Sequence, residues 1–170
     1  MKIDLTDARE TAIDREWLTN VYPFYLHDLS GFDDHYYTLN DRGLWEPDYL
    51  PSWLEDGPDH PLIFNESGGR VGFALVNEAP SPHLRPGIRF RVSEFFVLRR
   101  FRRSGIGRRA AMALFNRFQG RWQLSVLPRN KAAISFWLQV INEYAGGLYQ
   151  ETSKAGDIFY LFETAKRGKN

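Results

Sequence analysis

Residues 92–109 read VSEFFVLRRFRRSGIGRR. The first half is rich in aromatic and β-branched residues, which predicts a strand. Gly105 and Gly107 then predict a turn, and the sequence after them has helical periodicity. Glycines let a backbone approach a ligand closely, and a helix N-terminus presents unpaired N–H groups and a positive dipole end to phosphate oxygens. This order therefore predicts a site for an anion such as the pyrophosphate of a cofactor.

The positive charge of the chain is concentrated around this turn. Eight arginines fall between Arg89 and Arg109, whereas all 170 residues together carry a formal net charge of only +1. Local basicity favours a defined anionic ligand over nucleic acid at large, so we expect no nucleic-acid partner. The alternative for the arginines alone is a solvated basic face, but the glycine turn beside them favours a binding site.

Length and composition predict one globular domain over residues 1–170, with 43% hydrophobic and 25% charged residues. The absence of cysteine excludes a thiol nucleophile, a disulfide framework and a cysteine zinc site. The start of the sequence lacks the basic and apolar regions of a signal peptide, and no segment approaches the roughly 18 apolar residues of a membrane span. We therefore expect a cytoplasmic protein with no membrane contact.

The remaining pattern alternates strands with helices. Helical spacing runs from Thr11 to Tyr25, where Pro23 predicts a kink or break between two helical pieces. Proline and glycine in residues 31–61 predict irregular structure with at most one short helix at 49–55. This order predicts an α/β (α+β) fold with a mixed central sheet of about six to seven strands flanked by helices. Expected strands are residues 2–5, 62–65, 70–77, 88–98, 122–126, 148–151 and 158–163, and expected helices are 106–118 and 128–143.

Two motifs resemble those of a known family. Residues 102–107, RRSGIG, have the form Arg or Gln, two residues, Gly, one residue, Gly or Ala, between a strand and a helix. Residues 130–137, NKAAISFW, have the form Asn, two residues, Ala, two residues and two aromatics, after the strand WQLSV. Together with the hairpin that ends in VGFALV, they resemble the GNAT superfamily of acyl-CoA-dependent N-acetyltransferases over residues 62–141. The first 60 residues resemble the family only in general layout.

The resemblance implies a mostly antiparallel sheet in which a splayed strand pair forms a CoA cleft. The CoA-binding core would span about residues 62–145, and a substrate-side region about 11–61. The implied co-substrate is acetyl-CoA with no metal, and the implied acceptor is a small-molecule or peptide amine. Dimers are frequent in the family, so a homodimer is left open. The implied cofactor-binding residues are Phe95, Phe96, Val97 and Leu98 along the pantetheine arm, Arg102, Arg103, Ser104, Gly105, Ile106, Gly107 and Arg108 at the pyrophosphate, and Asn130.

The sequence departs from the family pattern at two catalytic positions. The tyrosine that often protonates the leaving thiolate in the family is Trp137 here, and Ser125 stands where some relatives have a glutamate base. Glu94 is the best substitute for the base, because in a strand it would share a face with the apolar Phe90, Val92, Phe96 and Leu98, which would raise its pKa. The alternative is a glutamate paired with an arginine or facing solvent. Tyr144, or else Tyr160, is the candidate acid.

Acidic and aromatic residues near residues 31–61 suggest an acceptor surface. Asp33-Asp34-His35-Tyr36-Tyr37 would suit a cationic amine through charge and cation–π contacts, although a solvated loop is equally compatible. The aromatic residues Trp17, Tyr22, Phe24 and Tyr25 are expected in the core. The four histidines, His27, His35, His60 and His83, show no metal-ligand spacing.

The sequence is compatible with three functions. The first is an N-acetyltransferase in which the amine attacks the thioester directly, since no cysteine exists to accept the acyl group. The second is an acyl-CoA-binding protein without chemistry, motivated by Trp137 and Ser125. The third is a nucleic-acid patch made by the arginines, whose affinity would fall steeply with salt and would not compete with CoA.

Overall fold

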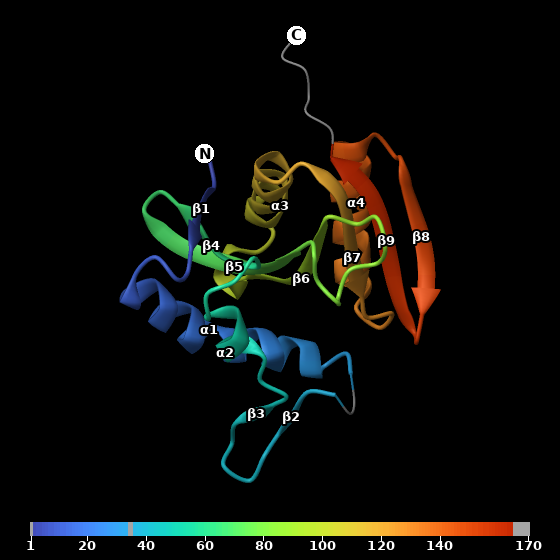
Figure 1. Ribbon diagram of the computed structural model, residues 1–170. Helices are drawn as coiled ribbons and strands as arrows, with labels where there is room; N and C mark the ends of the chain where they lie inside the picture. The colour runs from blue at the N-terminus through green and yellow to red at the C-terminus, as the bar shows by residue number, and fades with distance from the viewer. Residues whose placement is uncertain (1, 34–35, 165–170) are drawn as a thin grey trace.

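The computed structural model describes residues 2–33 and 36–164. Every predicted strand is present close to its expected bounds, and so are the predicted helices other than the pair expected on either side of Pro23. In chain order the elements are β1 (Asp4–Asp7), α1 (Ala12–Ser30), β2 (Thr38–Leu39), β3 (Trp45–Glu46), α2 (Leu50–Trp53), β4 (His60–Glu66), β5 (Gly69–Glu78), β6 (Phe90–Val97), a 3-10 turn (Arg99–Phe101), α3 (Ile106–Arg117), β7 (Gly120–Val126), α4 (Lys131–Ala145), β8 (Tyr149–Lys154) and β9 (Asp157–Thr164). The short hairpin of β2 and β3, which projects from the body in Figure 1, was not predicted.

Seven strands form one sheet in the order β1-β4-β5-β6-β7-β9-β8. Neighbouring strands are antiparallel except for β6 and β7, which confirms the predicted mixed, mostly antiparallel sheet. Helices cover both faces (Figure 1). Leu18 of α1 and Leu50 of α2 belong to the core on one face, and Leu114 of α3 and Ile141 of α4 to the core on the other.

The parallel strands β6 and β7 pair only near their beginnings. The pairing runs from Phe90 opposite Trp122 to Val92 opposite Leu124. Beyond this point β6 continues along β5 as far as Val97, while β7 continues along β9 as far as Val126. The two strands therefore diverge in the middle of the sheet, as the resemblance implied, and their facing edges border a gap.

A β-bulge lies in β6 just where this divergence begins. Leu75 of β5 is opposite Glu94, but the next residue, Val76, is opposite Val92. Ser93 is thus an extra residue without a register partner on β5. Such an insertion shifts the two-residue side-chain repeat of a strand by one position.

The bulge changes which alternate residues of β6 point to each face of the sheet. Phe90 and Val92, before it, belong to the core under α3 and α4, whereas Phe96 and Leu98, after it, pack in the core under α1. Glu94 lies two residues before Phe96 and so shares the α1 face with Phe96 and Leu98 alone. The expectation that Glu94 also shares a face with Phe90 and Val92 was wrong, because it assumed an unbroken repeat.

Helix α1 is one helix and not two. It begins after Thr11, whose hydroxyl accepts a hydrogen bond from the backbone N–H of Asp14. The helix continues through Pro23, which is exposed to solvent. The hydrogen bond that proline cannot make is therefore lost on the wet side of the helix, while the side facing the sheet stays packed. The prediction that Pro23 separates two helical pieces was wrong.

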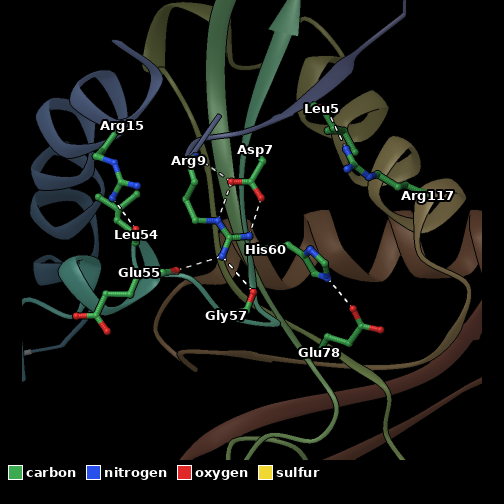
Figure 2. A network of polar contacts seen from close by, with 10 residues as sticks. All are labelled: Leu5, Asp7, Arg9, Arg15, Leu54, Glu55, Gly57, His60, Glu78 and Arg117. Carbon is green, nitrogen blue, oxygen red and sulfur yellow. Dashed lines mark hydrogen bonds and ion pairs between the residues drawn. The ribbon is translucent and has the colours of Figure 1, made fainter. Parts of the chain in front are cut away.

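Arg9 fixes the irregular segment that follows α2 to the edge of the sheet (Figure 2). Its guanidinium forms two hydrogen bonds with the Asp7 carboxylate, at 2.9 and 2.7 Å. The same guanidinium donates to the carbonyl oxygens of Glu55 and Gly57, each at 3.2 Å. Burial alone would raise the pKa of Asp7, but the hydrogen bonds and charge of Arg9 hold it below its usual value. This contact positions the end of the region predicted to lie on the substrate side.

Candidate active site

The gap between β6 and β7 opens into a cleft of about 570 Å³. Glu94 and Phe95 of β6 lie along one wall, and Ser125, Asn130 and Trp137 along the other. Helix α1, the segment after it and the start of β9 close the cleft. These parts contribute Tyr25, Leu29, Asp33, Tyr36, Tyr37 and Asp157, among others.

The edge of β6 presents backbone N–H groups to this cleft. The N–H of Leu98 donates to the carbonyl of Val71 on β5, at 3.0 Å. Residues of an antiparallel strand alternate in the side to which their backbone groups point. Counting back from Leu98, the backbone of Phe96 faces β5, and the N–H groups of Phe95 and Val97 face the side that β7 has left. These two amides are placed to donate to a ligand lying along β6.

The glycine turn leads directly into α3. Gly105 precedes the helix with a positive φ of 79°, a conformation that favours glycine. The first intrahelical hydrogen bond runs from the N–H of Arg109 to the carbonyl of Gly105. The N–H groups of Ile106, Gly107 and Arg108 therefore have no intrahelical acceptor and point out of the helix end. This is the arrangement that binds phosphate groups.

Gly107 permits close packing of this helix end against α4. A Cβ atom placed on Gly107 would lie 3.3 Å from the ring of Phe136 and 3.7 Å from Val97. The glycine therefore lets the first turn of α3 sit beside the end of β6 and the aromatic pair of α4.

Most of the arginine side chains in this corner are paired with carboxylates of the protein itself. Arg99 and Arg102 both bind Asp28 of α1, and Arg102 also donates to the Val97 carbonyl. Arg108 pairs with Glu143 of α4, and Arg109 pairs with Glu66 of β4. Among the described residues, Arg103 has no such ion pair. All these side chains were expected to supply charge to a phosphate. Arg103 and the exposed Arg100 are the two that remain candidates for this role.

Glu94 has the environment expected of a proton acceptor. Its side chain is partly buried in the cleft, and burial raises the pKa of Glu94 to about 7. A hydrogen bond from Tyr25 and the charge of Arg91 oppose this rise without cancelling it. Burial and the charge of Glu94 also raise the pKa of Tyr25 well above its ordinary value, so its hydroxyl stays protonated and donates to the carboxylate.

The opposite wall carries the helix motif. Asn130 caps α4, with its side-chain oxygen accepting from the N–H of Ala133 at 3.0 Å. Trp137, about two turns further on, is 6% exposed and contacts the ring of Phe95 edge-on at 5.0 Å between centroids. Ser125 at the end of β7 also reaches the cleft. The two positions that lack a catalytic side chain therefore do face the site.

Neither candidate acid is among the residues that line the cleft. Tyr144 lies near the C-terminal end of α4, where its hydroxyl donates to Asn116 of α3 at 2.9 Å. Tyr160 is 1% exposed in the core, on β9. Asn130, by contrast, is at the N-terminal end of α4. The structure thus brings Glu94, Phe95 and Asn130 together and places both tyrosines elsewhere.

The acceptor side of the cleft contains residues that the sequence did not single out. Asp33, Tyr36 and Tyr37 line it as expected, whereas Asp34 and His35 lie outside the described residues. Tyr25, expected in the core, and Arg91, counted only within the arginine cluster, also line it. So does Asp157, whose pKa is raised by burial and by the charge of Asp33. Tyr25 follows Tyr22 by about one helical turn, so the sequence could have indicated that it faces the sheet. Nothing in the sequence around Asp157 indicates that it lines the cleft.

Neither a metal-ion site nor a membrane-spanning helix is present in the part of the chain that the structure describes. Within residues 2–33 and 36–164, no group of three or more histidine and acidic side chains could hold a metal ion, and His60 instead contacts Glu78 at 2.7 Å (Figure 2). In the same residues no helix has the length and apolar character needed to cross a bilayer. A cytoplasmic location and a homodimer stay predictions.

Comparison with known proteins identifies the family. The sequence model of the acetyltransferase (GNAT) family matches residues 18–140, which is most of the chain. The chain therefore belongs to this family, and it is an N-acetyltransferase whose acyl donor is acetyl-CoA. No curated protein sequence matches it significantly.

Solved structures share the whole fold at low sequence identity. An acetyltransferase of the GNAT family from Streptococcus agalactiae is 12% identical, with a TM-score of 0.66 over 96% of both chains. The protein yncA from Salmonella typhimurium, solved with its cofactor acetyl-CoA, is 17% identical, with a TM-score of 0.58 over 100% of this chain and 98% of its own. The ribosomal-protein-S18-alanine N-acetyltransferase from Escherichia coli is 13% identical, with a TM-score of 0.52 over 99% and 97%.

Proposed function

We propose that the chain transfers the acetyl group of acetyl-CoA to a primary amine by direct attack in a ternary complex, with Glu94 as the proton acceptor. The observation that carries the proposal is the position of Glu94. Its carboxylate lies in the cleft immediately before Phe95, whose N–H faces the same gap. A base and an oxyanion donor are thus adjacent on one strand.

The binding of acetyl-CoA would use backbone groups more than side chains. The N–H groups of Ile106, Gly107 and Arg108, with the turn formed by Arg102, Arg103, Ser104 and Gly105, would hold the pyrophosphate oxygens. The edge of β6 from Phe95 through Phe96 and Val97 to Leu98 would pair with the pantetheine arm as an added strand does. Asn130, at the start of α4, would contact the arm from the opposite wall.

The proposed reaction forms one C–N bond and breaks one C–S bond. Glu94 first takes the proton that the ammonium loses, directly or through water, and the neutral amine nitrogen then attacks the thioester carbon. The second proton that this nitrogen releases as the amide forms passes to solvent. The N–H of Phe95 or Val97 stabilises the negative charge that develops on the carbonyl oxygen. The electron pair of the broken bond leaves with the thiolate. Since the chain has no cysteine, we propose no acyl-enzyme.

We assign no general acid to this reaction. Tyr144 donates its hydroxyl to Asn116, and Tyr160 is enclosed in the core. Trp137 has no acidic proton at neutral pH. The proposal therefore leaves protonation of the thiolate to solvent.

Thiol release over a panel of amines tests the function. We expect acetyl-CoA to bind and at least one amine to release CoA, with Glu94→Gln binding acetyl-CoA as the wild type does and turning over at least a hundredfold more slowly, the usual contribution of a general base. Tight acetyl-CoA binding without turnover of any amine would instead support the second candidate, a binding protein, which Trp137 and Ser125 favour.

A further inference from the structure

The bulge at Ser93 places two charged residues side by side in register. Arg91 is opposite Asn77 on β5, and Glu94 is opposite Leu75. Asn77 and Leu75 are two residues apart, so they point to the same face of their strand. Arg91 and Glu94 therefore also share one face, about 7 Å apart along the strand, although they are three residues apart in sequence. Both line the cleft.

Arg91 is unlike most of the other arginines near the cleft, because it has no carboxylate partner within the described residues. Its guanidinium donates from Nη1 to the carbonyl oxygen of His83, but the distance of 3.5 Å is too long for a strong hydrogen bond. Its Nε is buried and has no hydrogen-bond partner among those residues. Arg102 and Arg108, by comparison, each bind a carboxylate.

An arginine that lines a cleft and has no carboxylate partner among the described residues indicates an anionic ligand group, which its terminal Nη atoms would bind. Leaving a charged donor partly desolvated without a partner is costly, and a carboxylate satisfies the arginine fork best. Asp157 lines the cleft and is near enough for Arg91 to influence its pKa, yet no ion pair joins the two side chains within 4 Å. The missing partner is therefore expected from the acceptor.

The spacing of Arg91 and Glu94 suits a small acceptor that carries both charges. In an α-amino acid the nitrogen and the carboxyl carbon are about 2.5 Å apart. With a hydrogen bond of about 2.8 Å at each end, such a molecule bridges groups roughly 8 Å apart, and a guanidinium and a carboxylate at neighbouring positions of one face can adopt that separation. A diamine would place its second ammonium against Arg91, and the N-terminus of a peptide would offer a neutral amide there.

Resting on the proposed function, we infer that the acceptor is a free α-amino acid, whose carboxylate binds Arg91 while its ammonium faces Glu94. Arg91 is then the residue that selects the acceptor class. Its two-pronged hydrogen bonding also predicts that lysine, with the same charge but a single ammonium, replaces it only in part.

Matched acceptor pairs test this inference. Each L-amino acid is compared with the amine that lacks its carboxylate and with its amide, in wild type and in Arg91→Gln. Arg89→Gln is the control, since Arg89 stands just before β6 with a side chain 62% exposed, pairs with Glu78 and does not line the cleft. We expect the wild type to prefer the amino acids. Assayed well above the pKa of Glu94, so that its carboxyl is ionised in every variant, Arg91→Gln should lower their kcat/KM about ten- to hundredfold, as loss of a charged hydrogen bond does, and leave the paired amines unchanged. Arg91→Lys should fall in between.

Two results would overturn the inference while leaving acetyl transfer intact. One is a wild type that prefers a diamine, an amine without a carboxylate or a peptide N-terminus. The other is an Arg91→Gln variant that loses activity equally on amino acids and on amines. Should no amine turn over, titration calorimetry of L-amino acids into the CoA-loaded protein decides the matter. Binding that Arg91→Gln weakens and Arg89→Gln does not would support the inference, and absence of binding would end it.

Discussion

The Nε of Arg102 lies 2.7 Å from the carbonyl oxygen of Val97, the last residue of β6. The far end of the same guanidinium binds Asp28 of α1. Arg102 thus donates to the Val97 carbonyl, which points away from β5, and links the end of β6 to α1. This contact fixes the part of the edge whose N–H groups face the cleft, so the side chain of Arg102 acts on the shape of the site and not on a phosphate.

The arginines of the turn therefore divide into two kinds. Arg102→Gln is expected to lower the free energy of unfolding by about 1 kcal/mol, the usual value of such a hydrogen bond. Arg103→Gln should leave stability unchanged, but weaken CoA binding up to about fivefold and reduce its salt dependence, as loss of an exposed charge does. Urea unfolding and CoA titrations at two salt concentrations measure both effects. If Arg102→Gln weakened CoA binding without loss of stability, and Arg103→Gln lowered stability without loss of CoA affinity, this division would be contradicted.

Gly105 and Gly43 form a second matched pair. Both have positive φ, 79° and 73°, and no backbone atom lies near a Cβ placed on either. Alanine at either position should cost about 1 kcal/mol of stability, because an L-residue is strained in this conformation. Only Gly105→Ala should also weaken CoA binding, by about tenfold, since only this turn orients the N–H groups of Ile106 and Gly107. Equal CoA affinity in the two variants would show that the turn does not hold the cofactor.

Asp14 links the start of α1 to the sheet. Its carboxylate accepts from Thr11 at 2.6 Å and from Arg70 at 2.5 Å, and these hydrogen bonds hold its pKa below the usual value although burial opposes them. Asp14→Asn should lower the free energy of unfolding at pH 7 by about 2 kcal/mol, the value of hydrogen bonds to a charged group. The control Asp4→Asn, at an exposed ion pair with Lys2, should change little.

The pH dependence of this stabilisation has a definite sign. When folding lowers the pKa of a carboxyl group, the ionised group contributes its full stabilisation at pH values above its pKa in the unfolded state. This stabilisation disappears as the pH falls below about 4 and through the pKa of the folded state. The stability gap between wild type and Asp14→Asn should therefore close in acid. A gap that persists at low pH would mean that Asp14 acts by packing and not by charge.

Local patterns predicted the fold and the cofactor side of the site. The glycine spacing around Gly105, the apolar periodicity of α3 and α4 and the Asn130 cap are each encoded within a few residues. The bulge at Ser93 was not predictable, because it exists only relative to Leu75 and Val76 on another strand. In an unbroken strand, two residues that are three apart, such as Arg91 and Glu94, would point to opposite faces.

Pairings between distant residues were equally hidden from the sequence. Nothing near Arg102 or Arg108 indicates that Asp28 and Glu143 neutralise them. The same holds for the cleft itself, where Tyr25 of α1 and Asp157 of β9 meet Glu94 only through the topology of the sheet. Sequence reasoning singled out Glu94 as the candidate base, and the structure adds Tyr25 as its hydrogen-bond donor.

The pH profile of kcat/KM in wild type and Glu94→Gln tests the central claim most directly. If Glu94 accepts the proton, wild-type activity should rise with pH through about 7, the pKa to which burial raises this carboxyl, because only the deprotonated form can act. In Glu94→Gln that inflection should vanish and the residual activity should be low, with acetyl-CoA affinity unchanged. An inflection near pH 7 that persists in Glu94→Gln, with turnover close to wild type, would contradict the account.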